Sequence, residues 1–439
     1  MLAAGCFYYS LWNFQYTLLV VFVSVITYIA ARVIDHRRDR KGPVLIVYIV
    51  LELAILCLFK YVGFLGSIVN DILHILGSSK EFSVFQWILP VGISFYIFQT
   101  IAYVADVYLG KTPAERHFGY FAESVIFFPI LLAGPIEKIP FLTAQFKKEM
   151  SFSYEGSCRA FQRILLGYMK KLIIADSLAA ITGQIYSNIG GYVGFPLLIA
   201  IFLYAIEIYC DFSGYSDIAI GTAGLFGISI HENFKQPYFA DSIKDFWKRW
   251  HISLTSWFRE YVYIPLGGNR VAAWKQVRNV MCVYVLSGLW HGADWTFLAW
   301  GGMNGIAQVL ENVFYKRKHT IRVPKIIRQV IVFVLVSIMW VFFRMESMAD
   351  AVFVLAHCFD GVGALGAYLQ FGISQLGIPR MQGCLLAAFL LLLFWIDREK
   401  EKGAEKILNG IFVSILLAVG MFYYLRYGID SSTFIYFQF

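Results

Sequence analysis

Two histidines, His251 and His291, are the residues of this sequence whose type and surroundings best suit catalysis. His291 lies deep in an apolar stretch that begins after Arg278, so about 20 Å of helix would carry it well inside a membrane. An ionisable group at that depth is by default a functional candidate, although hydrogen bonding between helices is the simpler alternative. A neutral imidazole in a dry site can take the proton of a hydroxyl and so activate it toward a thioester or ester carbonyl.

His251 belongs to the segment 241–263, DSIKDFWKRWHISLTSWFREYVY, which is too charged to span a membrane. Its apolar residues recur at helical spacing, and Asp241 or Ser242 suits the N-cap. These features predict one amphipathic helix at the cytoplasmic membrane surface, with its tryptophans at headgroup depth. The histidine lies on the apolar stripe, where an imidazole is costly unless it is paired or used. The other members of the stripe are Ile243, Phe246, Trp247, Trp250, Leu254, Trp257, Phe258 and Tyr261.

The stretch from Asn279 to Leu310 contains Asp294 as its only formally charged residue. It is too long for one straight crossing of a hydrocarbon core about 30 Å thick. We therefore predict a helix break within the sequence SGLWHGADW. His291 should lie on the last turn of the first helix, and Asp294 should cap the second.

The composition indicates that membrane helices position these residues. Of the 439 residues, 59% are hydrophobic and only 15% are charged, whereas roughly a quarter are charged in soluble domains. The sequence therefore predicts an all-α, polytopic membrane protein that forms one domain over residues 1–439, with about ten or eleven membrane segments. These segments are expected near 14–34, 44–66, 86–109, 119–134, 160–180, 195–228, 279–293, 295–314, 327–344, 383–396 and 407–425.

The charge balance of 37 Lys and Arg against 29 Asp and Glu gives a net charge of +8. Much of this excess lies in short loops beside apolar stretches, which by the positive-inside rule should face the cytoplasm, leaving the loop at 70–85 outside. Binding to nucleic acid is not expected, because the aromatic residues lie mostly within the apolar stretches. The basic loops are 36–41, 138–148, 170–171, 244–278 and 316–328.

Other patterns typical of catalysis or ligand binding are missing from the sequence. The seven cysteines are scattered singly, which favours small core residues over a disulfide framework or a metal site. The two histidines lack a third ligand at metal-binding spacing, although His231 or Asp294 could complete such a site. No GxSxG, HExxH, P-loop or GxGxxG motif occurs in its required context. We therefore expect no bound metal or cofactor.

Longer motifs carry a resemblance to a known family. FWKRWHISLTSWFREYVYIPLGGNR at 246–270 and SGLWHGADWTFLAWG at 287–301 resemble the membrane-bound O-acyltransferase (MBOAT) family, and within it the bacterial alginate O-acetyltransferase branch. The resemblance is concentrated in residues 85–314 and extends to the aromatic tail FIYFQF. The sequence begins within a stretch that resembles the family's second hydrophobic region. This leaves three alternatives for the family's N-terminal helix: an upstream start, a truncation or a difference between lineages. The remaining motifs are LPVGISFYIFQTIAYVADVYLG, FFPILLAGPIEK, YCDFSGYSDIAIG and ENFKQPY.

The resemblance implies a ring of tilted helices around a central tunnel, with re-entrant or interfacial helices. It implies that His291, in the WHG motif, is the essential catalytic histidine, and that His251, in RWHISL, is the second motif histidine. Asn304 stands where relatives often have a histidine, so we assign it no proton-transfer role. Residues expected to line the tunnel or contact substrate are Arg249, Trp250, Trp290, Asn304, Asp211, Ser213, Tyr215 and Asp217. For the last four, the alternative is mutual hydrogen bonding that seals a helix break.

The resemblance also implies that an acyl group, expected to be acetyl, moves from a cytosolic thioester donor toward hydroxyls of an extracytoplasmic polysaccharide. The donor would be acetyl-CoA or an acyl carrier thioester, and transfer would be direct or through an SGNH-type transferase partner. The protein would be a multi-pass protein of the bacterial cytoplasmic membrane. Two alternatives stay open: D-alanyl transfer to teichoic acid, and a lipid or polysaccharide transporter, since transporters also use broken helices. The sequence does not identify the acceptor polymer.

Overall fold

The computed structural model describes most of the chain, and within the described residues every regular element is a helix. The aromatic tail and most of the segment expected at 407–425 lie outside them. The described residues are 1–37, 41–78, 80, 88–149, 151–316, 323–402, 419–420, 422–423 and 426.

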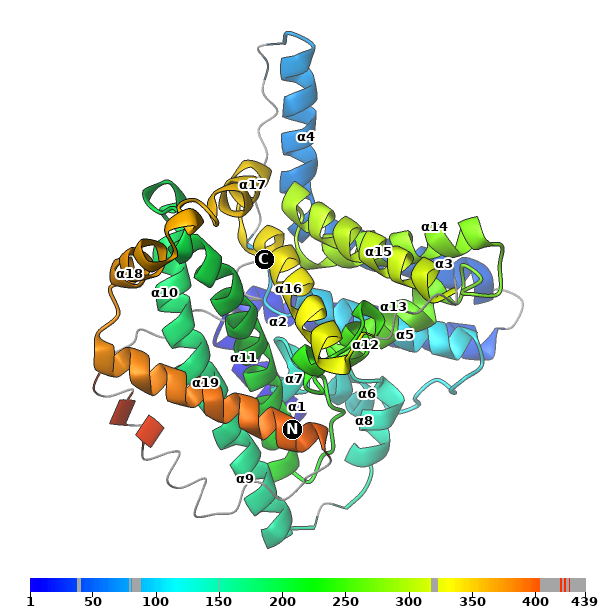
Figure 1. The fold of residues 1–439 in the computed structure, drawn as a ribbon. Helices are drawn as coiled ribbons and strands as arrows, with labels where there is room; N and C mark the ends of the chain where they lie inside the picture. The colour runs from blue at the N-terminus through cyan, green and yellow to red at the C-terminus, as the bar shows by residue number, and fades with distance from the viewer. Residues whose placement is uncertain are drawn as a thin grey trace.

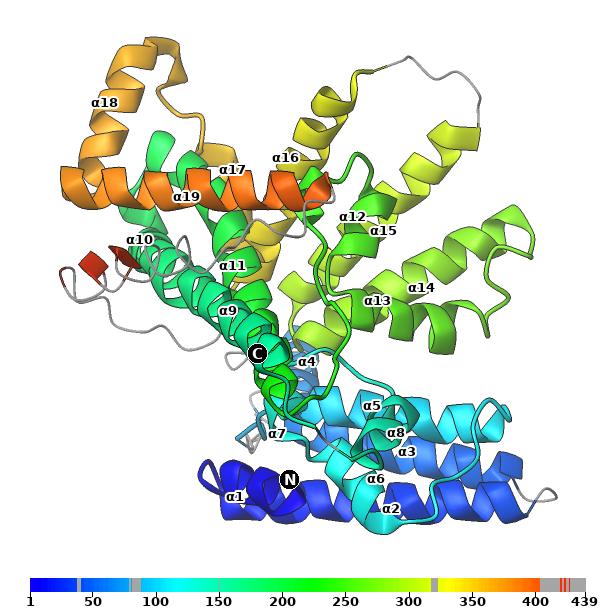
Figure 2. The ribbon, with the colours of Figure 1, turned by 90° about the horizontal axis from the view of Figure 1, so that it is seen from below.

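The N-terminal part of the fold is a layer in which α2 (Phe14–His36), α3 (Lys41–Lys60) and α5 (Ile93–Tyr108) lie side by side (Figure 2). A short helix, α1 (Leu2–Ser10), precedes them. The expected segment at 44–66 is two helices, because the chain changes direction at Tyr61. From there α4 (Val62–Ile75) stands away from the rest of the molecule (Figure 1).

The centre of the fold is α11 (Phe195–Leu225), which packs along α9 (Tyr154–Tyr168). Gly167 and Gly214 permit this close approach, because a Cβ on either glycine would collide with the carbonyl oxygen of the other. The π-helix η1 (Met169–Ala175) continues α9. The segment expected at 119–134 forms two short helices, the second starting with Pro129 in its first turn. Elements around this centre are α6 (Phe118–Val125), α7 (Phe128–Leu131), α8 (Ile139–Phe146), α10 (Asp176–Tyr186) and η2 (Ile189–Gly191).

The prediction of one continuous helix over 241–263 is wrong. The short turn η3 (Pro237–Phe239) is followed by α12 (Ile243–Arg249), which ends before His251. His251 takes a left-handed conformation with φ 44° and ψ 55°. Then α13 (Ile252–Phe258) runs into the π-helix η4 (Arg259–Tyr263). A helical spacing of apolar residues cannot reveal such a turn, because the chain resumes a helix immediately after it.

Much of the apolar stripe of this segment packs against protein. Phe246 is 0% exposed, Trp250 1% and Trp247 8%. The N-cap was predicted correctly, because the Ser242 hydroxyl accepts the Asp245 amide at 3.0 Å. The segment therefore contributes to the core of the protein.

The hairpin of α14 (Ala273–His291) and α15 (Trp295–Lys316) breaks where the sequence predicts. The Asp294 carboxylate accepts the Thr296 amide at 3.0 Å and so caps α15. Gly288 lets the two helices touch, because a Cβ there would collide with the carbonyl oxygen of Phe297. The break places His291 at the end of α14.

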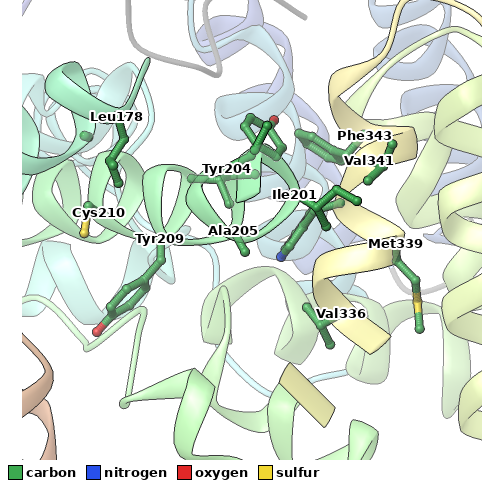
Figure 3. Packing of buried hydrophobic residues seen from close by; sticks show 14 of the residues in the cluster. Leu178, Ile201, Tyr204, Ala205, Tyr209, Cys210, Val336, Met339, Val341 and Phe343 are labelled. Atoms are coloured by element: carbon green, nitrogen blue, oxygen red, sulfur yellow. The ribbon is translucent and has the colours of Figure 1, made fainter. Parts of the chain in front are cut away.

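The C-terminal part covers α11 from another side. In Figure 3, Ile201 and Tyr204 of α11 lie toward Val341 and Phe343 of α16 (Lys325–Arg344). This packing extends the core from α11 to the aromatic residues around His291. The remaining elements are α17 (Met348–His357), η5 (Val362–Ala364), α18 (Leu365–Gln375) and α19 (Arg380–Glu401).

The chain is an integral membrane protein. Among the described residues, 5 helices are long and apolar enough to cross a membrane, or up to 6 if the bent pair α17 and α18 counts as one span. The five are α2, α3, α11, α16 and α19. The sequence predicted about ten or eleven segments. Of these, the one at 119–134 forms two short helices, and the one at 407–425 lies mostly outside the described residues.

Candidate functional site

His291 is the last residue of α14, where a helix leaves its final carbonyl groups without partners of its own. The junction of α3 and α4 supplies those partners. The Tyr61 hydroxyl donates to the Leu289 carbonyl at 2.8 Å. The Lys60 ammonium donates to the carbonyls of Trp290 and His291, the latter at 2.8 Å. A cation also suits the negative end of the helix dipole, so this junction fixes the helix end that carries His291.

Aromatic rings enclose the side chain of His291, a residue that is 4% exposed. The ring centroids of Trp290, Trp300 and Phe343 lie 4.9, 5.1 and 5.2 Å from the imidazole centroid. These rings are buried themselves. They exclude bulk water from the imidazole, as base catalysis in a dry site requires.

His251 occupies the left-handed turn between α12 and α13, a conformation that costs about 1 to 3 kcal/mol for a residue with a side chain. A neighbouring segment stabilises the turn through backbone hydrogen bonds. The Ile252 amide donates to the Asn233 carbonyl at 3.0 Å, and the Lys235 amide donates to the Arg249 carbonyl at 2.9 Å. The ENFKQPY motif therefore holds the chain on both sides of His251.

The Asn233 side chain, 0% exposed, orients the imidazole. Its Oδ1 accepts from the amide and the hydroxyl of Ser253 at 3.1 and 2.9 Å, and lies 3.3 Å from Nδ1 of His251. Because an amide oxygen can only accept, Nδ1 carries the proton and Nε2 is the basic nitrogen. Burial lowers the pKa of His251 to about 3, which keeps the ring neutral at physiological pH.

The two histidines belong to one site. Their ring centroids are 6.4 Å apart, with an angle of 61° between the ring planes. Trp290 lies 5.9 Å from His251, and Phe95 of α5 stacks on His251 at 6.2 Å. A shared aromatic wall thus joins α5, α14 and the turn before α13. A substrate bound at this wall can contact both imidazoles.

A partly open pocket lies beside His291. It is bounded by the end of α3, the start of α5 and the end of α14. The lining residues are Lys60, Leu89, Pro90, Val91, Gly92, Ile93, Ser94, Phe95, Leu132, Trp290 and His291.

Arg249 and Trp250 precede His251 but contact other partners. The Arg249 guanidinium donates to Asp245 at 2.8 Å and to Glu401 at the end of α19. The Trp250 ring lies 5.0 Å from Trp340 of α16. These contacts anchor α12 to the C-terminal helices.

Asn304 lies one turn after Trp300 on α15. Its side-chain amide donates to the Trp300 carbonyl at 2.9 Å, and the residue is 1% exposed. The Trp300 ring in turn contacts His291. Asn304 is therefore linked to the site indirectly, through Trp300.

The polar cluster predicted at residues 211–217 does not seal a helix break, because α11 runs unbroken through it. Its acids form ion pairs with basic residues of the neighbouring helix instead. Asp217 lies 2.8 Å from Lys170 and 2.9 Å from Arg163, and Asp211 lies 2.6 Å from Lys171. Ser213 is buried in the same stretch, and Tyr215 packs against the apolar clusters around α5 and α7. The cluster joins α11 to α9 and η1.

Sequence reasoning missed Lys60 and Asn233. The signal for Lys60 was its position as a lone charge inside the stretch predicted to span at 44–66. The signal for Asn233 was the ENFKQPY motif, to which the sequence alone assigned no role. Within the described part of the chain, no three His, Cys, Asp or Glu residues are grouped so that they could hold a metal ion.

Known proteins match the chain over most of its length. The membrane-bound O-acyltransferase family matches residues 116–349. The probable alginate O-acetylase of Pseudomonas aeruginosa is 35% identical over 405 residues, 91% of this chain and 76% of that protein. The peptidoglycan O-acetyltransferase of Helicobacter pylori is 34% identical over 385 residues, 81% and 72% of the two chains. The teichoic acid D-alanyltransferase of Streptococcus thermophilus is 28% identical over 248 residues, 53% and 59%.

The matched region contains both histidines and the hairpin whose break presents His291. The extent of these matches and their sequence identity are together sufficient to assign the protein to a family. The chain belongs to the membrane-bound O-acyltransferase family and is an O-acyltransferase.

Proposed function

We propose that this protein transfers an acetyl group from a cytosolic thioester donor toward hydroxyls of an extracytoplasmic polysaccharide, with His291 as the general base. The observation that carries the proposal is the position of His291, which is buried, held at a capped helix end and adjacent to a pocket. The similarity to O-acetyl-transferring relatives exceeds that to the D-alanyltransferase, which supports acetyl as the acyl group.

In the proposed reaction the acceptor hydroxyl gives its proton to His291 while its oxygen attacks the thioester carbonyl carbon. The carbonyl electron pair moves onto oxygen and returns as the carbon–sulfur bond breaks. The thiolate leaves with the proton that the imidazolium releases. His251, oriented by Asn233, positions the substrate beside His291.

The direction of transfer rests on the basic residues at the helix starts. Lys41 opens α3, and Lys275 and Arg278 lie in the first two turns of α14. By the positive-inside rule these ends face the cytoplasm, so the opposite ends, with Lys60 and His291, lie toward the other side. A tunnel through the helices from the cytoplasmic face would bring acetyl-CoA or an acyl carrier thioester to His291. An SGNH-type transferase, or the polysaccharide itself, would receive the acetyl group beyond it.

The experiment uses purified protein in lipid nanodiscs with radiolabelled acetyl-CoA and oligosaccharides of uronic acid or of peptidoglycan. We expect label on an acceptor with wild type, loss of transfer in His291→Ala, and full transfer in His357→Ala. The latter removes an exposed histidine of α17 and is the matched control. Transfer of D-alanine but not acetyl from a thioester would replace the proposal with D-alanylation. Movement of polymer across the membrane without label transfer would indicate a transporter.

A further inference from the structure

The pocket beside His291 is lined by hydrogen-bond donors to which base catalysis by His291 gives no role. Ser94, 8% exposed, lines the pocket from the first turn of α5. Within the described part of the chain its hydroxyl has no hydrogen-bond partner. The hydroxyl is therefore available to a ligand that enters the pocket.

Lys60 lines the same pocket, and its protonated amine would bring a positive charge there. An ammonium has three hydrogens to donate, and the contacts to the Trp290 and His291 carbonyls use two of them. Its ammonium also lies 5.9 Å from the Trp290 ring centroid. One donor of a cation that lines the pocket is thus left for a ligand.

The start of α5 adds a second positive feature. Gly92 caps this 16-residue helix with φ 80°, and a Cβ there would collide with the Leu131 carbonyl oxygen. The turn is therefore fixed against α7, with residues 92–95 lining the pocket. The positive end of the helix dipole faces the same space as Lys60 and Ser94.

We propose that Lys60 and Ser94 form the oxyanion site of the acyl transfer, holding the carbonyl oxygen of the acyl group while His291 takes the acceptor proton. This inference rests on the proposed function. As the acceptor oxygen bonds to the carbonyl carbon, the carbonyl π electrons move to oxygen, and the two donors stabilise the resulting negative charge. The charge disappears when the carbon–sulfur bond breaks, and the thiolate takes the proton from His291.

The kinetic test compares Lys60→Met, Ser94→Ala and Tyr61→Phe in the nanodisc assay. Tyr61→Phe removes a neighbouring cap of α14 without touching the pocket lining, so it reports what capping alone contributes. An oxyanion donor acts in the transition state, and its loss typically lowers kcat about 10²- to 10³-fold. We expect losses of that order in Lys60→Met, at least about tenfold in Ser94→Ala, and less than about threefold in Tyr61→Phe, with little change in KM.

Three kinetic outcomes would overturn the assignment. Equal losses in Tyr61→Phe and Lys60→Met would show that Lys60 acts only through the helix end. A raised KM with unchanged kcat would indicate ground-state binding instead. Activity retained in both Lys60→Met and Ser94→Ala would leave no oxyanion role. Failure of wild type to transfer any acyl group would instead refute the proposed function.

A binding measurement tests the site without relying on turnover. Acetate carries two carbonyl-type oxygens and one negative charge, so ¹³C-labelled acetate serves as the probe by NMR line broadening. We expect wild type and Tyr61→Phe to bind acetate, and Lys60→Met to bind it at least about tenfold more weakly, because charged donors form the stronger hydrogen bonds. Absence of binding to wild type, or binding that persists in both Lys60→Met and Ser94→Ala, would overturn the proposal.

Discussion

The two histidines reach the same site in opposite ways. His291 ends a regular helix, and side chains from another part of the fold satisfy the carbonyls around it. His251 sits in a left-handed turn that a local motif holds through Asn233. The contacts that cap α14 leave a donor of Lys60 beside a pocket. The hydrogen bonds around the turn instead hold the His251 ring in one orientation. The difference supports our proposal that His291 transfers the proton and His251 positions the substrate.

The largest effect should come from His291→Ala. A positioned base contributes about 10²- to 10⁴-fold to the rate, so acyl transfer should fall by at least a hundredfold. Expression and thermal stability should stay close to wild type. More than a tenth of wild-type transfer in a folded variant would remove His291 from the role of base.

His251→Ala should have the next largest effect, about ten- to a hundredfold on kcat, because a misplaced substrate loses that much rate. Burial lowers the pKa of His251 to about 3, so the ring is already neutral above that value. Its removal should therefore leave the shape of the pH–rate profile between pH 5 and 8 unchanged. A new or lost inflection in this range would show that His251 exchanges protons during turnover.

Asn233→Ala should resemble His251→Ala with a smaller loss, about tenfold. The substitution releases Nδ1 of His251 and the Ser253 donors but leaves the imidazole in place. Crystal or cryo-EM maps should show the ring rotated. Wild-type kinetics in this variant would mean that the backbone turn alone orients His251.

Asn304→Ala should change transfer by less than about threefold, because its amide bonds to a carbonyl of its own helix and a single such bond contributes about 1 kcal/mol. Thermal unfolding and kcat measured together would separate stability from catalysis. A loss as large as that of His251→Ala would place Asn304 in contact with substrate.

The sequence could predict the hairpin break, because an apolar stretch too long for one crossing must turn and Asp294 marks the new helix. It could not predict the turn at His251, since helical spacing continues across it. Nor could it predict that Asp211 and Asp217 are paired, because their counter-charges Lys171 and Lys170 lie on another helix. The length of an apolar stretch and the residue that caps a helix can be read from neighbouring positions in the sequence. Ion-pair partners on another helix cannot.

The same limit applies to the pocket. Lys60 and His291 are far apart in sequence, and only the folded chain shows that one caps the helix of the other. A lone lysine in an apolar stretch indicates that it has a buried partner, but it does not identify that partner. Functional groups contributed by distant segments are therefore the part of the site that needs the structure.

The central claim is that one histidine moves the proton and the other positions substrate for it. The most direct test compares His291→Ala with the double variant His251→Ala/His291→Ala under single-turnover conditions. If His251 acts only through the reaction that His291 catalyses, the double variant should be no slower than His291→Ala, since the two residues work as a unit. A further loss in the double variant equal to that of His251→Ala alone would show independent contributions and contradict the division of roles.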